Sequence, residues 1–185
     1  MPTPSRSACG SAGPEGGERG TVSDTGETER ISSIELDERT VARRTPEVEH
    51  ERRVAIYDLL ENNLFRPLKA GENGQSGPYK VMLSIEDNSR LVVDVATGAD
   101  AAVDRLILPL MPFRKIIKDY FRVCEAYFDA IKHAAPSRIE AIDMGRRGLH
   151  DEGSDLLRER LKGDVEIDHD TARRLFTLIC VLHAR

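Results

Sequence analysis

The chain has 185 residues, enough for one compact domain with its own hydrophobic core. Its net charge of −5 argues against non-specific binding to nucleic acid, and no apolar run approaches the roughly 20 residues that span a bilayer. The polar, glycine-rich start lacks the apolar core of a signal peptide, and the cysteines form no paired framework, so we expect a cytoplasmic protein with no membrane partner.

Residues 1–30 are predicted to be a disordered tail. They hold six of the 14 glycines and three of the nine prolines, and Val22 is their only branched aliphatic residue. Such a segment cannot bury enough apolar surface to offset the entropy lost on ordering it. Residues 31–185 are therefore predicted to form a single α+β domain.

The domain is predicted to begin with a strand at residues 31–36 and a helix that starts at Pro46. Thr45 is a favourable N-cap, proline fits the first helical position, and Glu47 and Glu49 suit the positive end of the helix dipole. Apolar residues then recur at helical spacing, so we expect this helix to end near residue 62.

Three further strands are predicted after a loop rich in glycine and asparagine at residues 69–78. Residues 79–86 alternate between apolar and polar side chains, and residues 87–89 favour a tight turn into a return strand at residues 91–95. Residues 103–110 are predicted to form a third, more buried strand. The alternation makes the first two strands the clearest hairpin in the chain.

Helices dominate the remainder of the prediction. Pro112 opens a helix with one apolar stripe, which we expect to lie across the sheet, and Ser137 and Glu140 have the spacing of a capping box for the next helix. A short strand at residues 165–167 precedes a final helix capped by Asp168 or Asp170. The expected fold is α+β, with a small antiparallel sheet (a hairpin plus one or two further strands) packed against about four helices.

Several segments resemble uncharacterised protein family 0262, a set of small hypothetical proteins of alphaproteobacteria. They are PEVEHER (residues 46–52), AIYDLLE (55–61), PFR with KDYF (112–114 and 118–121), EAIDMGRRGLH (140–150) and TARRLFTLICVLH (171–183). The resemblance covers roughly residues 30–185 and implies a bacterial cytoplasmic protein. It implies no activity, ligand or catalytic residue, because the family has none assigned.

The most unusual segment is the polar edge of the helical pattern at residues 137–161. At 100° per residue, Arg146 falls within the apolar stripe, and Asp143, Arg147 and His150 line its edge. A guanidinium facing a core needs a carboxylate, a carbonyl or an anionic ligand, and Asp143 can reach either arginine. Three interpretations remain open, namely an internal ion-pair network, a site for a small anion or nucleotide-like ligand, and a partner interface.

Three glycines in the same segment need a physical reason. Gly145, Gly148 and Gly153 would each cost about 0.8–1 kcal/mol in a helix interior relative to alanine. Either the helix breaks, with Gly148 as the expected point, or another part of the chain packs closely against it. A break would place the arginines at a bend and would favour a ligand site.

A second, weaker candidate for ligand binding is the start of the helix that follows Pro112. Its first turn carries Arg114 and Lys115 and no acid, which is the reverse of what the helix dipole favours, and Lys118 follows one turn later. Helix N-termini bind anions readily, and added cations strengthen that tendency. The alternative is a solvated basic face compensated by neighbouring acids.

No motif in the chain predicts a metal site, a cofactor or a catalytic triad. There is no HExxH, P-loop, GxSxG or GxGxxG pattern, and Cys124 and Cys180 are expected to be buried, inert thiols. We favour a non-catalytic binding or adaptor protein that uses the arginine cluster to engage an anionic ligand or an acidic protein surface. The alternative is a small enzyme for a phosphorylated or anionic substrate, with His150 as acid/base. A homodimer is possible, and a nucleic-acid partner is not expected.

Overall fold

The computed structural model describes residues 28–37, 39 and 45–183 of the chain. The predicted disordered tail lies outside these residues, apart from residues 28–30. In chain order the elements are β1 (Ile31–Leu36), α2 (Pro46–Glu61), β2 (Phe65–Pro67), α3 (Leu68–Glu72), β3 (Tyr79–Glu86), β4 (Arg90–Thr97), β5 (Ala102–Pro109), the 3-10 turn η2 (Met111–Phe113), α4 (Arg114–His133), α5 (Pro136–Leu161), β6 (Val165–Ile167) and α6 (His169–His183).

The main sheet has four strands in the order β1-β3-β4-β5. Strands β3 and β4 form the predicted hairpin, and Asp87 and Asn88 at its turn have positive φ angles of 50° and 52°. Two successive positive φ angles match the strand twist of a tight hairpin. The α+β class is confirmed, and the sheet differs from the expected one in being mixed, because β1 runs parallel to β3.

A second, two-stranded sheet pairs β2 with β6 in antiparallel register. The sequence predicted β6 and not β2, because the proline in the Phe-Arg-Pro sequence of β2 argues against a strand. The short helix α3 lies within the predicted loop at residues 69–78. Arg66 of β2 donates to Glu166 of β6 at 2.8 Å and to Glu29 at 2.7 Å, so residue 29 takes part in the folded domain.

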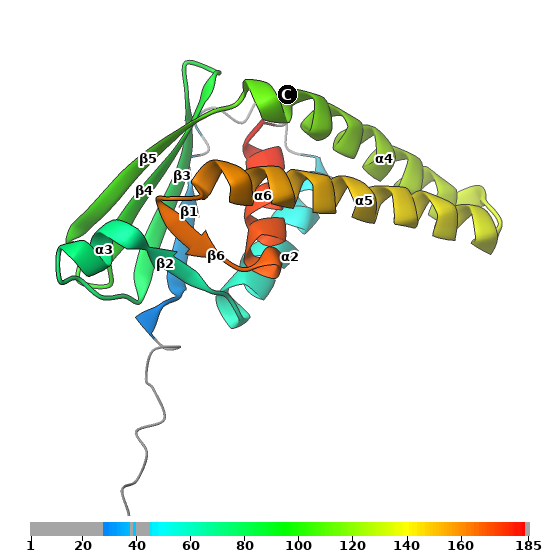
Figure 1. Cartoon of the computed structure of the whole chain (residues 1–185). Helices are drawn as coiled ribbons and strands as arrows, with labels where there is room; N and C mark the ends of the chain where they lie inside the picture. The colour runs from blue at the N-terminus through cyan, green and yellow to red at the C-terminus, as the bar shows by residue number, and fades with distance from the viewer. Residues whose placement is uncertain (1–27, 38, 40–44, 184–185) are drawn as a thin grey trace, which may run out of the picture.

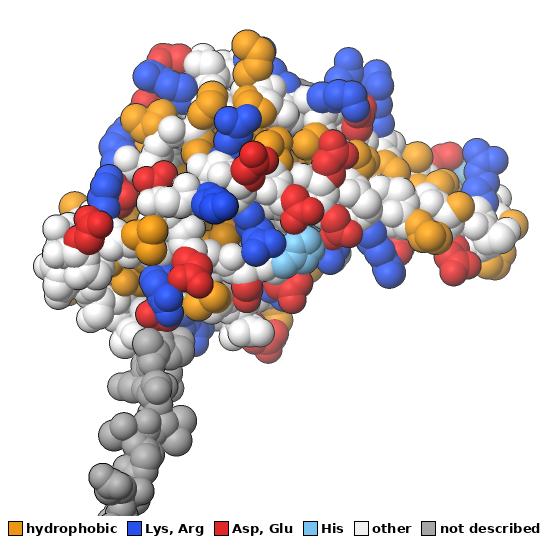
Figure 2. All heavy atoms as spheres, in the orientation of Figure 1, with side chains coloured by type: hydrophobic (Ala, Val, Ile, Leu, Met, Phe, Trp, Pro, Cys, Tyr) orange, Lys and Arg blue, Asp and Glu red, His pale blue; other side chains and the backbone are white. Residues whose placement is uncertain are grey.

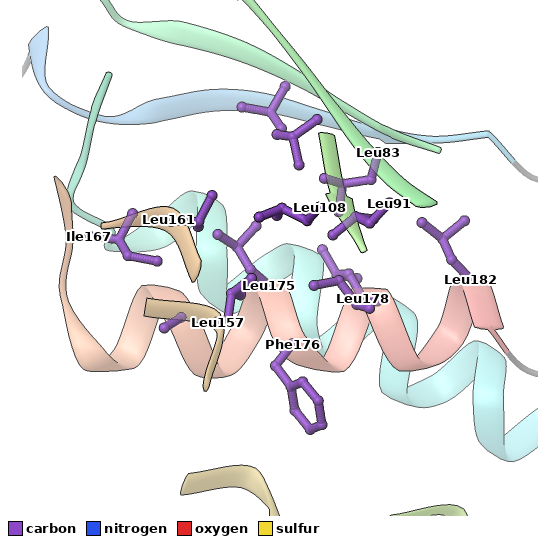
Figure 3. Packing of buried hydrophobic residues seen from close by; sticks show 14 of the residues in the cluster. Leu83, Leu91, Leu108, Leu157, Leu161, Ile167, Leu175, Phe176, Leu178 and Leu182 are labelled. Atoms are coloured by element: carbon purple, nitrogen blue, oxygen red, sulfur yellow. The ribbon is translucent and has the colours of Figure 1, made fainter. Parts of the chain in front are cut away.

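Helix α6 forms the centre of the hydrophobic core. Figure 3 shows Leu175, Leu178 and Leu182 on its side toward Leu83, Leu91 and Leu108 of the sheet, whereas Phe176 points the opposite way. The buried side chains of α6 are therefore distributed around the helix. Thr171 starts this buried run and accepts a hydrogen bond from the Leu64 backbone at 3.0 Å, which ties α6 to the segment after α2.

Helices α4 and α5 form an antiparallel pair that extends away from the sheet (Figure 1). The prediction that α4 lies across the sheet is wrong, because α6 occupies that position (Figure 1). The physical reason is that α4 carries one apolar stripe and many charges, whereas α6 is apolar on several sides. A helix with a single apolar stripe can bury that stripe against one neighbouring element.

Helix α5 is continuous over 26 residues, so a break at Gly148, one of the two alternatives that the sequence left open, does not occur. Ala135 is its N-cap and Pro136 its first residue, so the predicted capping box of Ser137 and Glu140 is not formed. A Cβ atom at Gly153 would overlap the ring of Phe176, whereas a Cβ at Gly148 would meet nothing within 4 Å. Close packing by α6 therefore explains Gly153, and packing does not explain Gly148.

Candidate functional site

Helices α2, α5 and α6 line a cavity of about 290 Å³ that is open to solvent, which we call the polar cavity. Three of the predicted site residues, Arg146, Arg147 and His150, line it together, and Asp143 lies one turn earlier on α5. The other lining residues come from α2 and α6 and are Glu51, Val54, Ala55, Asp58, Asp170, Arg173, Arg174 and Thr177.

Asp143 holds both neighbouring arginines. Its Oδ1 lies 2.7 Å from Nη2 of Arg146, and its Oδ2 lies 2.8 Å from Nη2 of Arg147. The hydrogen bond from Arg146 lowers the pKa of the Asp143 carboxyl below its usual range. The ion pairs expected from helical spacing are thus formed, and they fix the guanidinium of Arg146 beside the cavity.

Arg146 has two further contacts that fix its position. Its guanidinium carbon lies 4.8 Å from the ring centroid of Tyr127, and its Nη1 lies 4.0 Å from Oε1 of Glu51. The side chain is half-buried, whereas that of Arg147 is 69% exposed. Arg146 is therefore a fixed part of the cavity wall, and Arg147 can reorient toward a ligand.

His150 closes the inner end of the polar cavity. Its ring stacks on Tyr120 at 4.7 Å between centroids and meets Phe176 edge-on at 6.3 Å. Its Nε2 lies 3.3 Å from Oγ1 of Thr177, whose hydroxyl donates to the Arg173 carbonyl. Because a hydroxyl has a single proton to donate, the donation to Arg173 favours the tautomer in which Nε2 carries the proton and Nδ1 does not.

Burial, together with the nearby charges of Arg173 and Arg146, lowers the pKa of His150 to about 4. Asp151 acts in the opposite direction with a smaller effect. A histidine with this pKa is neutral at pH 7. It can exchange hydrogen bonds with a ligand there but has almost no proton to donate as a general acid.

The sequence did not reveal the contribution of α2 and α6 to this cavity. Arg173 lies 3.7 Å from Asp151, and Arg174 donates to the backbone carbonyl of Asn62 at 3.5 Å, an acceptor without formal charge. The available signal was the pair of arginines in an otherwise apolar helix. Asp151, the partner of Arg173, does not line the cavity and also lies 3.3 Å from His169.

The second predicted group, at the start of α4, is divided by the structure. Arg114 and Lys118 line a larger cavity of about 560 Å³, which we call the apolar cavity, whereas Lys115 pairs with Asp119 at 2.9 Å on another side of the helix. Arg114 also donates to the backbone carbonyl of Asn88 at 3.0 Å. The other lining residues are Thr45, Val48, Asn88, Ile117, Phe121, Cys124, Glu125, Phe128 and His183.

A thin layer of side chains separates the two cavities. A void of about 30 Å³ within this layer is bounded by Glu51 and Thr177 of the polar cavity and by Phe121 and Cys124 of the apolar cavity. Tyr120 crosses the layer, and its hydroxyl donates to Glu51 at 3.3 Å. Burial raises the pKa of Tyr120, so its phenol stays protonated at neutral pH.

Both described cysteines are buried, as the sequence predicted. Burial raises the pKa of Cys124 to about 11 and raises that of the fully buried Cys180 as well. Since the thiolate is the reactive form, neither is an activated nucleophile. Among the residues that the structure describes, no three His, Cys, Asp or Glu side chains gather as a metal site would require.

Charges of both signs are mixed on the surface. On the face shown in Figure 2, the Lys and Arg side chains alternate with Asp and Glu, without a broad region of one sign. Within the described part of the chain, no helix has the length and apolar character needed to cross a bilayer.

The sequence comparisons identify the family. A sequence model of the uncharacterised protein family UPF0262 matches residues 28–185. The chain belongs to this family. A UPF0262 protein of Rhodospirillum rubrum is 58% identical over 159 residues, which cover 86% of this chain and 95% of that protein.

Other relatives in the family are similarly close. A UPF0262 protein of Paramagnetospirillum magneticum is 56% identical over 85% of this chain and 97% of its own length. One of Caulobacter vibrioides is 56% identical over 84% of this chain and 94% of its own length. No solved structure matches the chain. The family match begins at residue 28, which is also where the described residues begin.

Proposed function

We propose that this member of the family is a binding protein for a small anion, which it holds in the polar cavity. The observation that supports this is the convergence of four arginines, from α5 and α6, on one open cavity. Guanidinium groups bind carboxylates and phosphates through paired hydrogen bonds. At about 290 Å³ the cavity suits a ligand at the small end of the range for binding pockets.

The two sides of the polar cavity differ in charge, which orients the proposed ligand. The charged lining residues of α2 are the acids Glu51 and Asp58, whereas α5 contributes two arginines and α6 contributes two arginines and one acid, Asp170. An anionic group is repelled by the α2 side, so it should lie against α5 and α6. Arg147 and Arg174 are the expected direct contacts, because Arg146 is half-buried against Tyr127, whereas Arg147, although paired with Asp143, is exposed.

Binding is a better account of this cavity than catalysis. The enzyme alternative is supported by the cavity that His150 shares with two arginines. An efficient acid/base group needs a pKa near the working pH, and burial lowers the pKa of His150 to about 4. The adaptor alternative rests on the exposed Arg147, which an acidic protein surface could reach. The cytoplasmic location expected from the sequence stays a prediction.

The test is a thermal-shift titration of the full chain with inorganic phosphate, a sugar phosphate and a nucleotide. We expect at least one of them to raise the melting temperature of the wild type, because a ligand that binds only the folded state stabilises it. Arg147→Ala and Arg174→Ala should each reduce that rise. Arg158→Ala is the matched control, since this arginine is also on α5 but does not line the polar cavity.

Two outcomes would contradict the proposal. One is a wild type whose melting temperature no anion changes, which would leave the adaptor function. The other is an equal loss of response in Arg158→Ala and Arg147→Ala, which would show that the anions act on general surface charge.

A further inference from the structure

We propose that the apolar cavity is a second binding site, independent of the first, for a chain-like apolar molecule that carries one anionic head group. The shape of the cavity is the first argument. Its α4 side is a single stripe of residues spaced three or four apart, which are Arg114, Ile117, Lys118, Phe121, Cys124, Glu125 and Phe128. With a rise of about 1.5 Å per residue, this stripe is roughly 21 Å long.

The chemistry of the lining is the second argument. Ile117, Phe121, Cys124 and Phe128 give the groove an apolar floor, and Val48 of α2 faces them. Ile117 is only 2% exposed and belongs to the hydrophobic core, so the floor is fixed by packing beneath it. The volume of about 560 Å³ falls within the range of small-molecule sites, roughly 300–1,000 Å³.

Positive charge is confined to one end of this groove. Arg114 and Lys118 lie at the start of α4, where the helix dipole adds a partial positive charge and the first turn has no acid. Among the residues that the structure describes, Arg114 donates to a neutral carbonyl and neither Arg114 nor Lys118 forms an ion pair, although the charge of Lys118 also acts on Asp119. Lys115, in contrast, is paired with Asp119 and does not line the groove.

The far end of the groove has the opposite character. Glu125 lies there, two turns beyond Lys118, together with Phe128. An anionic head would be repelled at that end, so the ligand should lie with its head at the start of α4 and its tail toward Phe128. A charge at one end of an elongated apolar groove matches a medium-chain carboxylate, sulfate or phosphate ester better than it matches a nucleotide.

The experiment uses a fluorescent fatty acid, dansylaminoundecanoate, which brightens in an apolar environment. The full chain is titrated with this probe, which is then displaced with decanoate, decanol and decyltrimethylammonium, all below their aggregation concentrations. We expect saturable binding of the probe and displacement by decanoate. The concentration that displaces half of the probe should be at least tenfold higher for decyltrimethylammonium than for decanoate, because its tail has nearly the same length and its head has the opposite charge. The concentration of decanol needed for the same displacement should lie between those two values.

Variants localise the head-group contact. Arg114→Ala and Lys118→Ala should each weaken probe binding about tenfold, which corresponds to about 1.4 kcal/mol. Lys115→Ala is the matched control, because it removes a cation of the same helix start that faces another side, and Arg147→Ala is the control for the polar cavity. All four side chains are exposed at their charged ends, so folding should not be affected.

Three results would overturn the proposal. They are an absence of saturable binding to the intact chain, equal displacement by the anionic and cationic chains, and a loss in Lys115→Ala as large as that in Arg114→Ala. The first would mean that the groove is closed by another part of this chain or by a partner. The other two would mean that the probe binds apolar surface without recognition of its head.

Discussion

The polar and apolar cavities use the same kind of charged side chain in opposite ways. In the polar cavity Arg146 is fixed by Asp143 and Tyr127, so its charge is placed before any ligand arrives. In the apolar cavity Arg114 and Lys118 are exposed and flank a floor of core side chains. A charge that the protein holds in place, as in the polar cavity, favours recognition of a small polar group. A charge without an ion-pair partner beside packed rings, as in the apolar cavity, favours a molecule with an apolar body.

The largest expected effect concerns the inner side of the polar cavity, where Gly153 meets Phe176. Gly153→Ala should lower the free energy of unfolding by about 3 kcal/mol, the upper end of the usual cost of overpacking, because the added methyl overlaps an aromatic ring. Urea unfolding measures this. Gly148→Ala on the same helix is the control and should raise stability by up to about 1 kcal/mol, since nothing lies within 4 Å of the new methyl.

An equal change in the free energy of unfolding in the two glycine variants would contradict this prediction. It would show that α6 does not pack rigidly against α5 at the polar cavity.

The second expected effect is a dependence of stability on pH that originates at His150. Burial lowers the folded-state pKa to about 4, whereas the unfolded value is 6.5, so between these values the unfolded chain binds more protons. The free energy of unfolding therefore keeps its full value above pH 6.5, where the ring is neutral in both states, and decreases as the pH falls toward 4. Between pH 7.5 and pH 5 this amounts to about 2 kcal/mol.

Urea unfolding at both pH values, in the wild type and in His150→Gln, measures this contribution. The variant should lose about 2 kcal/mol less than the wild type on acidification, because glutamine does not titrate. His169→Gln is the matched control for the loss of an imidazole ring, since that histidine is 42% exposed at the surface. A variant at position 150 with the full pH dependence would place the titrating group elsewhere.

The third effect separates the two cavities directly. Arg174→Ala should weaken binding of the small anion about tenfold, or 1.4 kcal/mol, and leave binding of the fatty acid probe unchanged. Arg114→Ala should do the reverse. Isothermal titration of both ligands into both variants measures the four affinities, and a variant that weakens both ligands equally would show that they share one site.

The smallest effect is a difference in reaction rate between two thiols. Cys124 lines the apolar cavity and Cys180 lies beneath it, and burial raises the pKa of both. Iodoacetamide at pH 7.5 should therefore modify both slowly, with Cys124 ahead of Cys180, and bound decanoate should slow Cys124 further. Peptide mass spectrometry follows each site, and faster modification of Cys180 would contradict the described cavity.

Features that depend on near neighbours in the chain were predictable from the sequence. Thr45 caps α2 by accepting from the Val48 backbone at 3.3 Å, as its residue type and position before Pro46 indicated. The hairpin turn at Asp87 and Asn88 and the pairing of Asp143 with the arginines three and four residues later follow the same logic. In each case the partner lies within a few residues.

Features that depend on distant contacts were not predictable. The reason for Gly153 lies at Phe176, and the α6 side of the polar cavity comes from arginines more than 20 residues beyond Arg147. The parallel pairing of β1 with β3 depends on the path of the chain through α2, β2 and α3. One-dimensional periodicity specifies which face of an element is buried, but not which other element covers it.

The layer around Tyr120 has a consequence for how the two cavities would behave together. Its void of about 30 Å³ is bordered by Tyr120, by Glu51 and Thr177 of the polar cavity, and by Phe121 and Cys124 of the apolar cavity. A ligand of the apolar cavity that moved Tyr120 would also change the hydrogen bond from its hydroxyl to Glu51, which lines the polar cavity. Such coupling is necessarily reciprocal, so each ligand would alter the affinity of the other by the same factor. The affinities for two chemically different ligands would then be linked through the position of one phenol ring.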